Sequence, residues 1–366
     1  VMAMADAATT NGNHQHAEDA DDGESTPSAL RIASLLPSTT DICISLRLER
    51  RVVGVTHECD FPSSSHPLFL SPAPLVVDGG ANVGDGKDDV TNEPPSPPLT
   101  LTVSQIDPDL QSQVEIDSAV KSSLHDGISL YNLNGSSLAD AAPTIILTQS
   151  LCDVCAVATS DVNDEVACNF RPGECRVVSL EPESLEEVVE SFVTVAEACG
   201  VKRRGEELSH KFWAGMHQIS HATSLSKRGR KPTVLFLEWM DPPFDAGHWI
   251  PDMLERGGCI SALSWSKSTP KSVQLSWERV YECDPDVVVV GCCGFDLARN
   301  ERDALAARER LAPLRAFRDG NVYATDGNLY FARPGPGLRE GAAILARCAY
   351  DGDGEAAKAL EGLDFL

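Results

Sequence analysis

The sequence predicts an α/β protein in which mainly parallel strands lie on either side of a helical bridge. Short apolar runs alternate with helical stretches in both halves of the chain, which is the pattern of parallel sheets. A strongly periodic helical segment, residues 184–222, separates the two halves. The 366 residues, 42% of them hydrophobic and 23% charged, are enough for two globular lobes.

Residues 29–183 are expected to form the first lobe. Residues 1–28 are polar, acidic and poor in aromatics, so we expect them to be disordered. A stretch rich in Pro, Gly and Asp at about 73–98 lacks the strand and helix of a phosphate-binding loop and is interpreted as a mobile insertion. The predicted strands of this lobe are Leu30–Leu36, Val52–Val55, Thr144–Leu147 and Arg176–Leu180. One helix is expected from a cap at Ser38 or Thr39 to about Leu48, and a second over Glu115–Asp126.

The bridge, residues 184–222, has the clearest helical pattern of the chain. Ser184 and Glu187 match a capping box, and Gly200 is a natural helix stop. Apolar residues recur at spacings of three and four on two helical faces: Leu185, Val188, Val189, Phe192, Val195, Ala196 and Cys199, then Leu208, Phe212, Met216 and Ile219. Two helices in succession are therefore expected to connect the lobes.

Residues 223–350 are expected to form the second lobe, followed by a C-terminal tail at 351–366. Pro242 and Pro243 are expected to end the strand before them, because proline cannot continue a ladder. Pro251 suits the first turn of a helix. The other predicted elements are strands at Val234–Leu237, Val287–Val290 and Val322–Ala324, and helices at Leu275–Cys283, 299–318 and Leu338–Tyr350.

The chain is strongly acidic, with 55 acidic and 30 basic residues and a formal net charge of −25. Such a surface repels phosphate backbones and anionic lipid, so we expect no nucleic-acid partner and no membrane insertion. No apolar run approaches the roughly 20 residues that span a bilayer. The twelve irregularly spaced cysteines, without a secretion signal, indicate reduced thiols. The cytoplasm is the expected compartment, with an organelle left open because the leading valine indicates an incomplete start.

Aromatic and polar side chains gather after the predicted strand Val234–Leu237. Ligands of open α/β sheets bind outside the carboxyl ends of the strands, so this cluster predicts one wall of a ligand site. A packed loop is the alternative for any single residue of the cluster. The candidate ligand-binding residues after this and other strands are His57, Glu58, Gln149, Glu238, Trp239, Phe244, His248, Trp249, Phe295, Tyr330, Phe331 and Arg333. Their rings would supply apolar contact faces, while Glu238, His248 and Arg333 would orient the ligand.

Thiols and imidazoles also follow the strands, and three or four of them could meet if the strand ends converge. The candidate metal ligands are Cys59, Cys152, Cys155, Cys293, His57 and His248. Thiolate and imidazole favour zinc, iron or a cobalt corrinoid over magnesium or calcium. The other interpretation is inert thiols that line an apolar pocket. No nucleophile elbow, phosphate loop or metalloprotease helix is present, so no catalytic residue is assigned.

Seven motifs fall in the order found in one known family. They are Arg31–Pro37, Val53–Asp60, Cys152–Val157, Glu238–Trp239 with Asp241–Phe244, Gly247–Trp249, Cys293–Phe295, and Tyr330–Phe331 with Arg333–Pro336. From about Arg31 to Tyr350 the chain resembles the cobalamin-binding branch of the periplasmic iron-siderophore and corrinoid binding proteins, the class III substrate-binding proteins with a helical backbone. The resemblance implies two Rossmann-like lobes joined by a helical bridge, with one ligand in the cleft between them. Transport members of the family carry a secretion signal or lipid anchor, and this chain shows neither.

We therefore expect a monomeric, intracellular binding protein that holds cobalamin or another corrinoid in an interlobe cleft. A transporter partner is left open. The alternative is a thiol- and histidine-dependent zinc or iron protein, or a metalloenzyme that reuses the same cleft. An enzyme is the less expected class because the sequence offers no catalytic motif.

Overall fold

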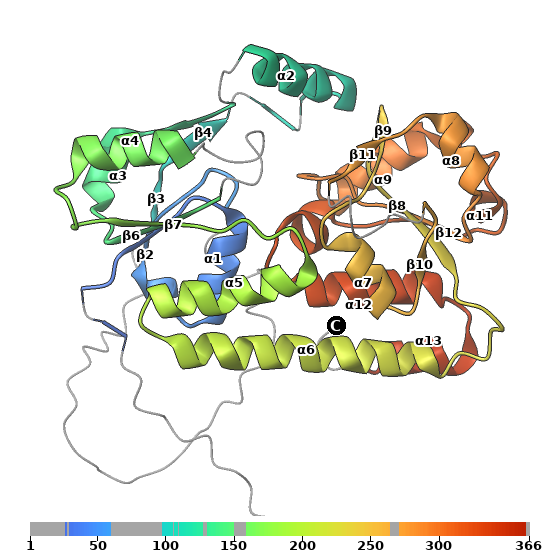
Figure 1. The fold of residues 1–366 in the computed structure, drawn as a ribbon. Helices are drawn as coiled ribbons and strands as arrows, with labels where there is room; N and C mark the ends of the chain where they lie inside the picture. The colour runs from blue at the N-terminus through green and yellow to red at the C-terminus, as the bar shows by residue number, and fades with distance from the viewer. Residues whose placement is uncertain are drawn as a thin grey trace, which may run out of the picture.

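The chain folds into two α/β lobes on a pair of bridging helices (Figure 1). The computed structural model describes residues 26–27, 29–59, 97–104, 106–108, 110–126, 130–149, 159–263 and 271–363. Most of the N-terminal segment, nearly all of the expected insertion at 73–98, and both Cys152 and Cys155 lie outside these ranges. The predicted fold class is confirmed, since strands in both sheets are mainly parallel and helices surround them.

The first lobe is built on a parallel sheet in the order β3-β2-β1-β6-β7. Its strands are β1 (Ile32–Ser34), β2 (Val52–Val55), β3 (Leu99–Thr100), β6 (Ile145–Thr148) and β7 (Arg176–Ser179). Its helices are α1 (Pro37–Ser45), α3 (Gly135–Ala141) and α4 (Thr159–Asn169), with a short 3₁₀ turn, η1 (Glu49–Arg51). The predicted cap at Ser38 or Thr39 is wrong, because α1 already begins at Pro37 and its N-cap is Leu36. Proline suits this first turn since its missing N–H would have no partner there.

The second lobe has a mixed sheet in the order β11-β9-β8-β12-β13, with β10 also paired to β8. Its strands are β8 (Thr233–Met240), β9 (Pro243–Asp245), β10 (Ile260–Ser261), β11 (Val273–Gln274), β12 (Val287–Val290) and β13 (Val322–Ala324). Its helices are α7 (Ile250–Arg256), α8 (Trp277–Cys283), α9 (Leu297–Ala306), α10 (Arg308–Leu311), α11 (Arg315–Arg318), α12 (Leu338–Ala349) and α13 (Gly354–Glu361), with the π-helical turn η3 (Asn328–Ala332). The segment 351–366, expected as a tail, contains α13, which packs on the bridge.

The strand expected to end at Leu237 continues to Met240 and turns back into β9. The two strands are antiparallel, with Met240 opposite Pro243 and Trp239 opposite Phe244. Strand β8 does end before the two prolines, as predicted, but Pro243 takes part in the ladder, which was not predicted. Pro243 is the first residue of its strand, a position where the missing N–H costs no ladder hydrogen bond.

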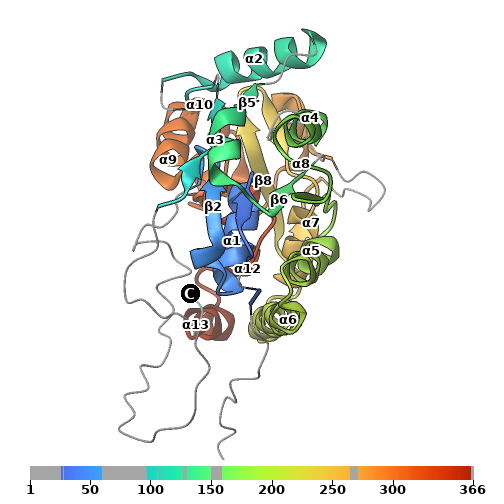
Figure 2. The ribbon, with the colours of Figure 1, turned by 90° about the vertical axis from the view of Figure 1, so that its left-hand side faces the viewer.

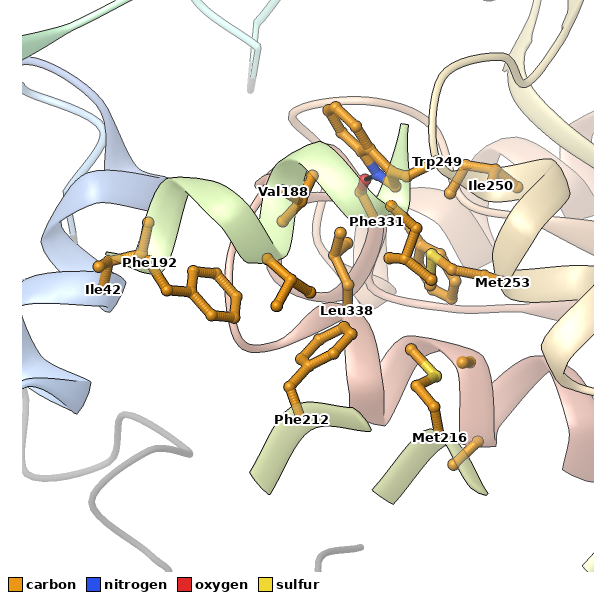
Figure 3. Packing of buried hydrophobic residues seen from close by; sticks show 14 of the residues in the cluster. Ile42, Val188, Phe192, Phe212, Met216, Trp249, Ile250, Met253, Phe331 and Leu338 are labelled. Atoms are coloured by element: carbon orange, nitrogen blue, oxygen red, sulfur yellow. Dashed lines mark hydrogen bonds between the residues drawn. The ribbon is translucent and has the colours of Figure 1, made fainter. Parts of the chain in front are cut away.

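The bridge consists of α5 (Leu185–Ala198) and α6 (Lys202–Ser224). The Ser184 hydroxyl caps α5 by accepting the Glu187 N–H at 3.2 Å, as predicted, while the Glu187 carboxylate accepts the N–H of Glu183 rather than that of Ser184. Helix α6 runs beneath both lobes (Figures 1 and 2). Phe192 and Phe212 pack edge to face at 5.7 Å in a core that continues from α1 to α7 and α12 (Figure 3). The lobes thus share one apolar core through the bridge.

Residues 102–133 of the first lobe form a separate projecting segment, the arm. It begins with β4 (Thr102–Ser104), carries α2 (Gln113–Asp126), and returns through β5 (Tyr131–Leu133). The two strands pair antiparallel in a small sheet of their own. Helix α2 lies at the opposite end of the molecule from α6 in both views of the ribbon (Figures 1 and 2).

Candidate functional site

The end of β8 carries an acid whose orientation is held by the neighbouring chain. Glu238 is half-buried, and both of its carboxylate oxygens accept the Ser272 hydroxyl, at 2.8 and 2.9 Å. Ser272 in turn accepts the backbone N–H of Gly247 at 3.3 Å. The carboxylate is therefore pre-oriented at the carboxyl end of the sheet, where ligands of α/β folds bind.

Trp239 begins an aromatic row beside this acid. Its indole lies 5.0 Å from the ring of Phe295, over which the Arg299 guanidinium sits at 4.1 Å, and Phe244 is its cross-strand neighbour. The Trp239 Nε1 atom is buried and has no hydrogen-bond partner among the described residues. A buried donor without an acceptor is costly, so this N–H is a candidate contact for a ligand acceptor.

His248 adds a second buried nitrogen on the same lobe. Its Nδ1 has no hydrogen-bond partner within the described ranges, and its backbone has a φ of 53°, in the left-handed region. Burial lowers the pKa of the imidazole, with Lys271 lowering it further and Glu183 acting in the opposite direction. The ring is therefore neutral at pH 7 and presents a lone pair for a metal centre or a hydrogen-bond donor.

Two of the predicted ligand-wall aromatics lie in the shared core instead. Trp249 is buried and donates its indole N–H to the backbone carbonyl of Phe331 at 2.8 Å. The Phe331 ring is also buried (Figure 3), and its centroid lies 4.8 Å from that of Phe236. A ligand could contact these rings only if the core opened. Their neighbour Tyr330 is half-buried, and burial raises the pKa of its phenol.

Arg333 ties the two lobes together. Its side chain is 4% exposed and faces the 7% exposed carboxylate of Asp41 on α1, with 3.8 Å between the nearest charged atoms. Its Nε also donates to Asn328 at 3.3 Å. The guanidinium predicted to orient a ligand thus bridges the second lobe to the first in this structure.

His57 and Cys59, which both follow β2 in the first lobe, contact different parts of the structure. The Cys59 thiol lies 3.2 Å from the Thr40 hydroxyl and 3.4 Å from that of Thr56, and burial raises its pKa. The half-buried His57 ring instead contacts the arm through the Thr102 hydroxyl at 2.8 Å and stacks on Tyr131 at 5.5 Å.

The remaining first-lobe candidates stand at two separate places. Glu58 is exposed and accepts the Tyr131 hydroxyl at 3.3 Å, beside His57. Gln149 is buried at the end of β6.

The described residues include only four of the six predicted metal ligands. Across 29–59, 97–149 and 159–363, omitting the undescribed gaps, no three His, Cys, Asp or Glu side chains form a metal-binding group. Cys293 is half-buried after β12 and donates its backbone N–H to the Glu238 carbonyl at 3.1 Å. Since Cys152 and Cys155 lie outside the described residues, the metal set stays a prediction.

Asp245, on β9, is a buried acid that the sequence analysis missed. It is 3% exposed, and its Oδ2 has no hydrogen-bond partner in the described part of the chain. Burial, with a smaller contribution from Glu238, raises its pKa to about 7. Only the antiparallel pairing of β8 and β9 reveals this position, because a local pattern places Asp245 in a loop.

One hollow outlined by described residues lies away from this edge. It has a volume of about 710 Å³ and is bordered by residues of α6, α7 and the loop after α6. Its guanidinium groups already have acidic partners: Arg228 pairs with Asp353, and Arg256 with Glu186. We assign no ligand to it.

The chain belongs to the periplasmic binding protein family, whose model matches residues 108–329, more than half of the sequence. The fold is shared with the periplasmic heme-binding protein RhuT from Roseiflexus sp. RS-1, at 20% identity and a TM-score of 0.58, covering 90% of this chain and 99% of that one. It is also shared with the periplasmic vitamin B12 binding protein BtuF of Vibrio cholerae, at 14% identity, a TM-score of 0.55, and coverage of 91% and 98%. Ceue of Helicobacter pylori with Ni(II) bound matches at 15% identity and a TM-score of 0.56, covering 91% and 85%.

No curated protein is significantly similar in sequence. Within the described ranges, no helix has the length and apolar character that crossing a membrane demands.

Proposed function

We propose that this protein binds a metal-centred macrocycle, a corrinoid in the first place, against the strand ends of its second lobe. The observation that carries this proposal is the pair of buried nitrogens without partners in the described chain, Trp239 Nε1 and His248 Nδ1, on an edge lined with aromatic rings. Apolar faces with a few convergent polar groups are typical of small-molecule sites. Solved structures with this fold include a heme-binding protein, a vitamin B12 binding protein and a protein with Ni(II) bound, and these support the choice of ligand class.

Each residue of this edge would have a distinct part in binding. The rings of Trp239 and Phe244 would cover the flat face of the macrocycle, and Glu238 would accept hydrogen bonds from its amide substituents. His248 is half-buried, and partial burial lowers its pKa, so its neutral ring would supply a nitrogen to iron or cobalt. Cys59, Cys152, Cys155 and Cys293 would be a thiol set for zinc or iron only if the undescribed pair joins them.

We also propose that the protein works as a monomer inside the cell. Its acidic surface keeps copies apart, and its twelve irregularly spaced cysteines suit a reducing compartment.

The test is a titration of the reduced protein with hemin, dicyanocobinamide and cyanocobalamin, followed by absorption and calorimetry. We expect one saturable site for at least one probe. Trp239→Phe keeps a ring but removes the N–H, and a lost hydrogen bond of about 1 to 1.5 kcal/mol corresponds to roughly tenfold weaker binding. Trp213→Phe is the matched control, because Trp213 lies on α6 beneath Arg256. Absence of binding by all three probes, or unchanged affinity in Trp239→Phe, would refute the proposal.

A further inference from the structure

The arm of the first lobe docks on the second lobe through one buried amide. Gln113, at the start of α2, is 6% exposed, and its Oε1 accepts the backbone N–H groups of Met240 at 2.8 Å and Asp241 at 3.1 Å. Its Nε2 donates to Asp303 at 2.8 Å and lies 3.6 Å from the Cys292 sulfur. Both the oxygen and the nitrogen of the Gln113 amide therefore contact the second lobe, near the end of β8.

Arg299 holds the chain just before α2. Its guanidinium donates to the backbone carbonyls of Pro108 and of Gln111, the latter at 3.0 Å, and pairs with Asp303 at 2.9 Å. The same guanidinium lies over the ring of Phe295, which contacts Trp239. The arm is thus connected to the aromatic row of the candidate site through Arg299 of α9.

Apolar side chains of the arm complete the docking. Ile116 is 7% exposed and belongs to the core cluster of the second lobe, and Ile106 and Val120 pack against that cluster. Further along α2, Lys121 donates to Gln274 of β11 at 3.3 Å.

The other end of the arm stays on the first lobe. Thr102 accepts the His57 backbone N–H at 3.2 Å, and Leu101 beside it donates to Val55 of β2 at 2.8 Å. The arm therefore spans both lobes at the end of the molecule opposite the bridge (Figure 1).

We propose that the arm is a latch that must detach from the second lobe before a ligand can reach Trp239. The control of ligand access rests on the proposed function, whereas the docking of the arm on the second lobe does not. Most contacts between the arm and the second lobe are hydrogen bonds, which water can replace when the arm detaches. Detachment would also expose few apolar side chains. A segment held in this way is one that can open locally. The bridge, by contrast, is part of a continuous core.

Hydrogen exchange on the intact protein tests whether the arm detaches as a unit. Arg299→Ala removes the hold on Pro108 and Gln111 without touching the Met240 and Asp241 amides. We expect at least tenfold faster exchange at residues 240–241 and throughout α2, with β1 unchanged. Val114→Ala is the control, because that side chain is 50% exposed on the same helix. Faster exchange confined to the neighbours of Arg299, or none, would overturn the latch.

Binding kinetics with hemin and cyanocobalamin test whether the latch controls access. In Arg299→Ala we expect both association and dissociation to be about tenfold faster, with a smaller change in Kd, whereas Val114→Ala should match the wild type. Unchanged rates despite faster exchange would overturn the control of access. If neither probe binds any of these proteins, the proposed function fails, and exchange alone then decides whether the arm is a latch.

Discussion

Replacing Asp245 by asparagine should make the protein more stable in mild alkali and remove part of its pH dependence. The carboxyl group is 3% exposed, and burial, with the nearby Glu238, raises its pKa from an ordinary 3.8 to about 7. Between those two pH values the folded state keeps a proton that the unfolded chain has released. Stability therefore falls as pH rises from about 4 to about 7, and the loss is complete above that range.

The size of the effect follows from the difference between the two pKa values. A rise from 3.8 to about 7 corresponds to about 4 kcal/mol of lost stability, an upper limit if Asp245 gains water as it ionises. An asparagine side chain has the shape of the protonated acid and carries no charge at any pH. We therefore expect the free energy of unfolding of Asp245→Asn to exceed that of the wild type by only about 1 kcal/mol at pH 4.5 and by up to about 4 kcal/mol at pH 8.

Urea unfolding at pH 4.5 and pH 8, for wild type and variant, measures both differences. Asp140→Asn, which neutralises an exposed acid on α3, is the control for the change in net charge and should not reproduce the effect. The reasoning is refuted if Asp245→Asn follows the wild-type pH profile, or if it is the less stable protein at pH 8.

Three further substitutions test the packing that positions the site. Arg333→Met removes the guanidinium that faces the buried carboxylate of Asp41 and should cost about 3 to 5 kcal/mol in urea unfolding, most of which the double variant with Asp41→Leu should recover. Phe192→Ala removes a fully buried ring from the shared core and should cost about 3 to 5 kcal/mol, with both lobes still unfolding in one transition by fluorescence and circular dichroism. Gly327→Ala places a methyl group against backbone atoms of the loop after β12 and should lower the free energy of unfolding by more than about 1 kcal/mol, whereas Gly229→Ala, with open space around it, should change it little.

Local patterns were enough to predict the fold class and most of its elements. The bridge was visible because apolar residues at spacings of three and four and the Ser184 cap are properties of one short segment. The apolar run Val287–Val290 likewise forms a strand buried on both faces. The hairpin of β8 and β9 escaped prediction because antiparallel pairing depends on a partner strand, and two prolines argued against a ladder.

The site was harder to predict because an aromatic residue after a strand can face a ligand or the core. Trp239 and Trp249 have similar sequence surroundings, yet the Trp249 N–H reaches the carbonyl of Phe331, 82 positions away, whereas the Trp239 N–H has no partner among the described residues. That difference comes from tertiary packing. Arg333 likewise matched a ligand-binding motif, but its buried partner Asp41 lies on the other lobe.

The arm shows how these long-range contacts bear on the opening of the protein. The sequence predicted a helix over Glu115–Asp126, but nothing local indicated that Gln113 would end on the backbone of another lobe. Among the described residues, connections between the lobes include the core of the bridge, the buried pair of Arg333 and Asp41, and the arm. Breaking the first exposes a large apolar surface, and breaking the second separates two buried opposite charges, so both are costly. The arm is the connection whose release costs least, because water can replace most of its contacts. Ligand access is therefore expected to depend on movement of the arm while the bridge stays rigid.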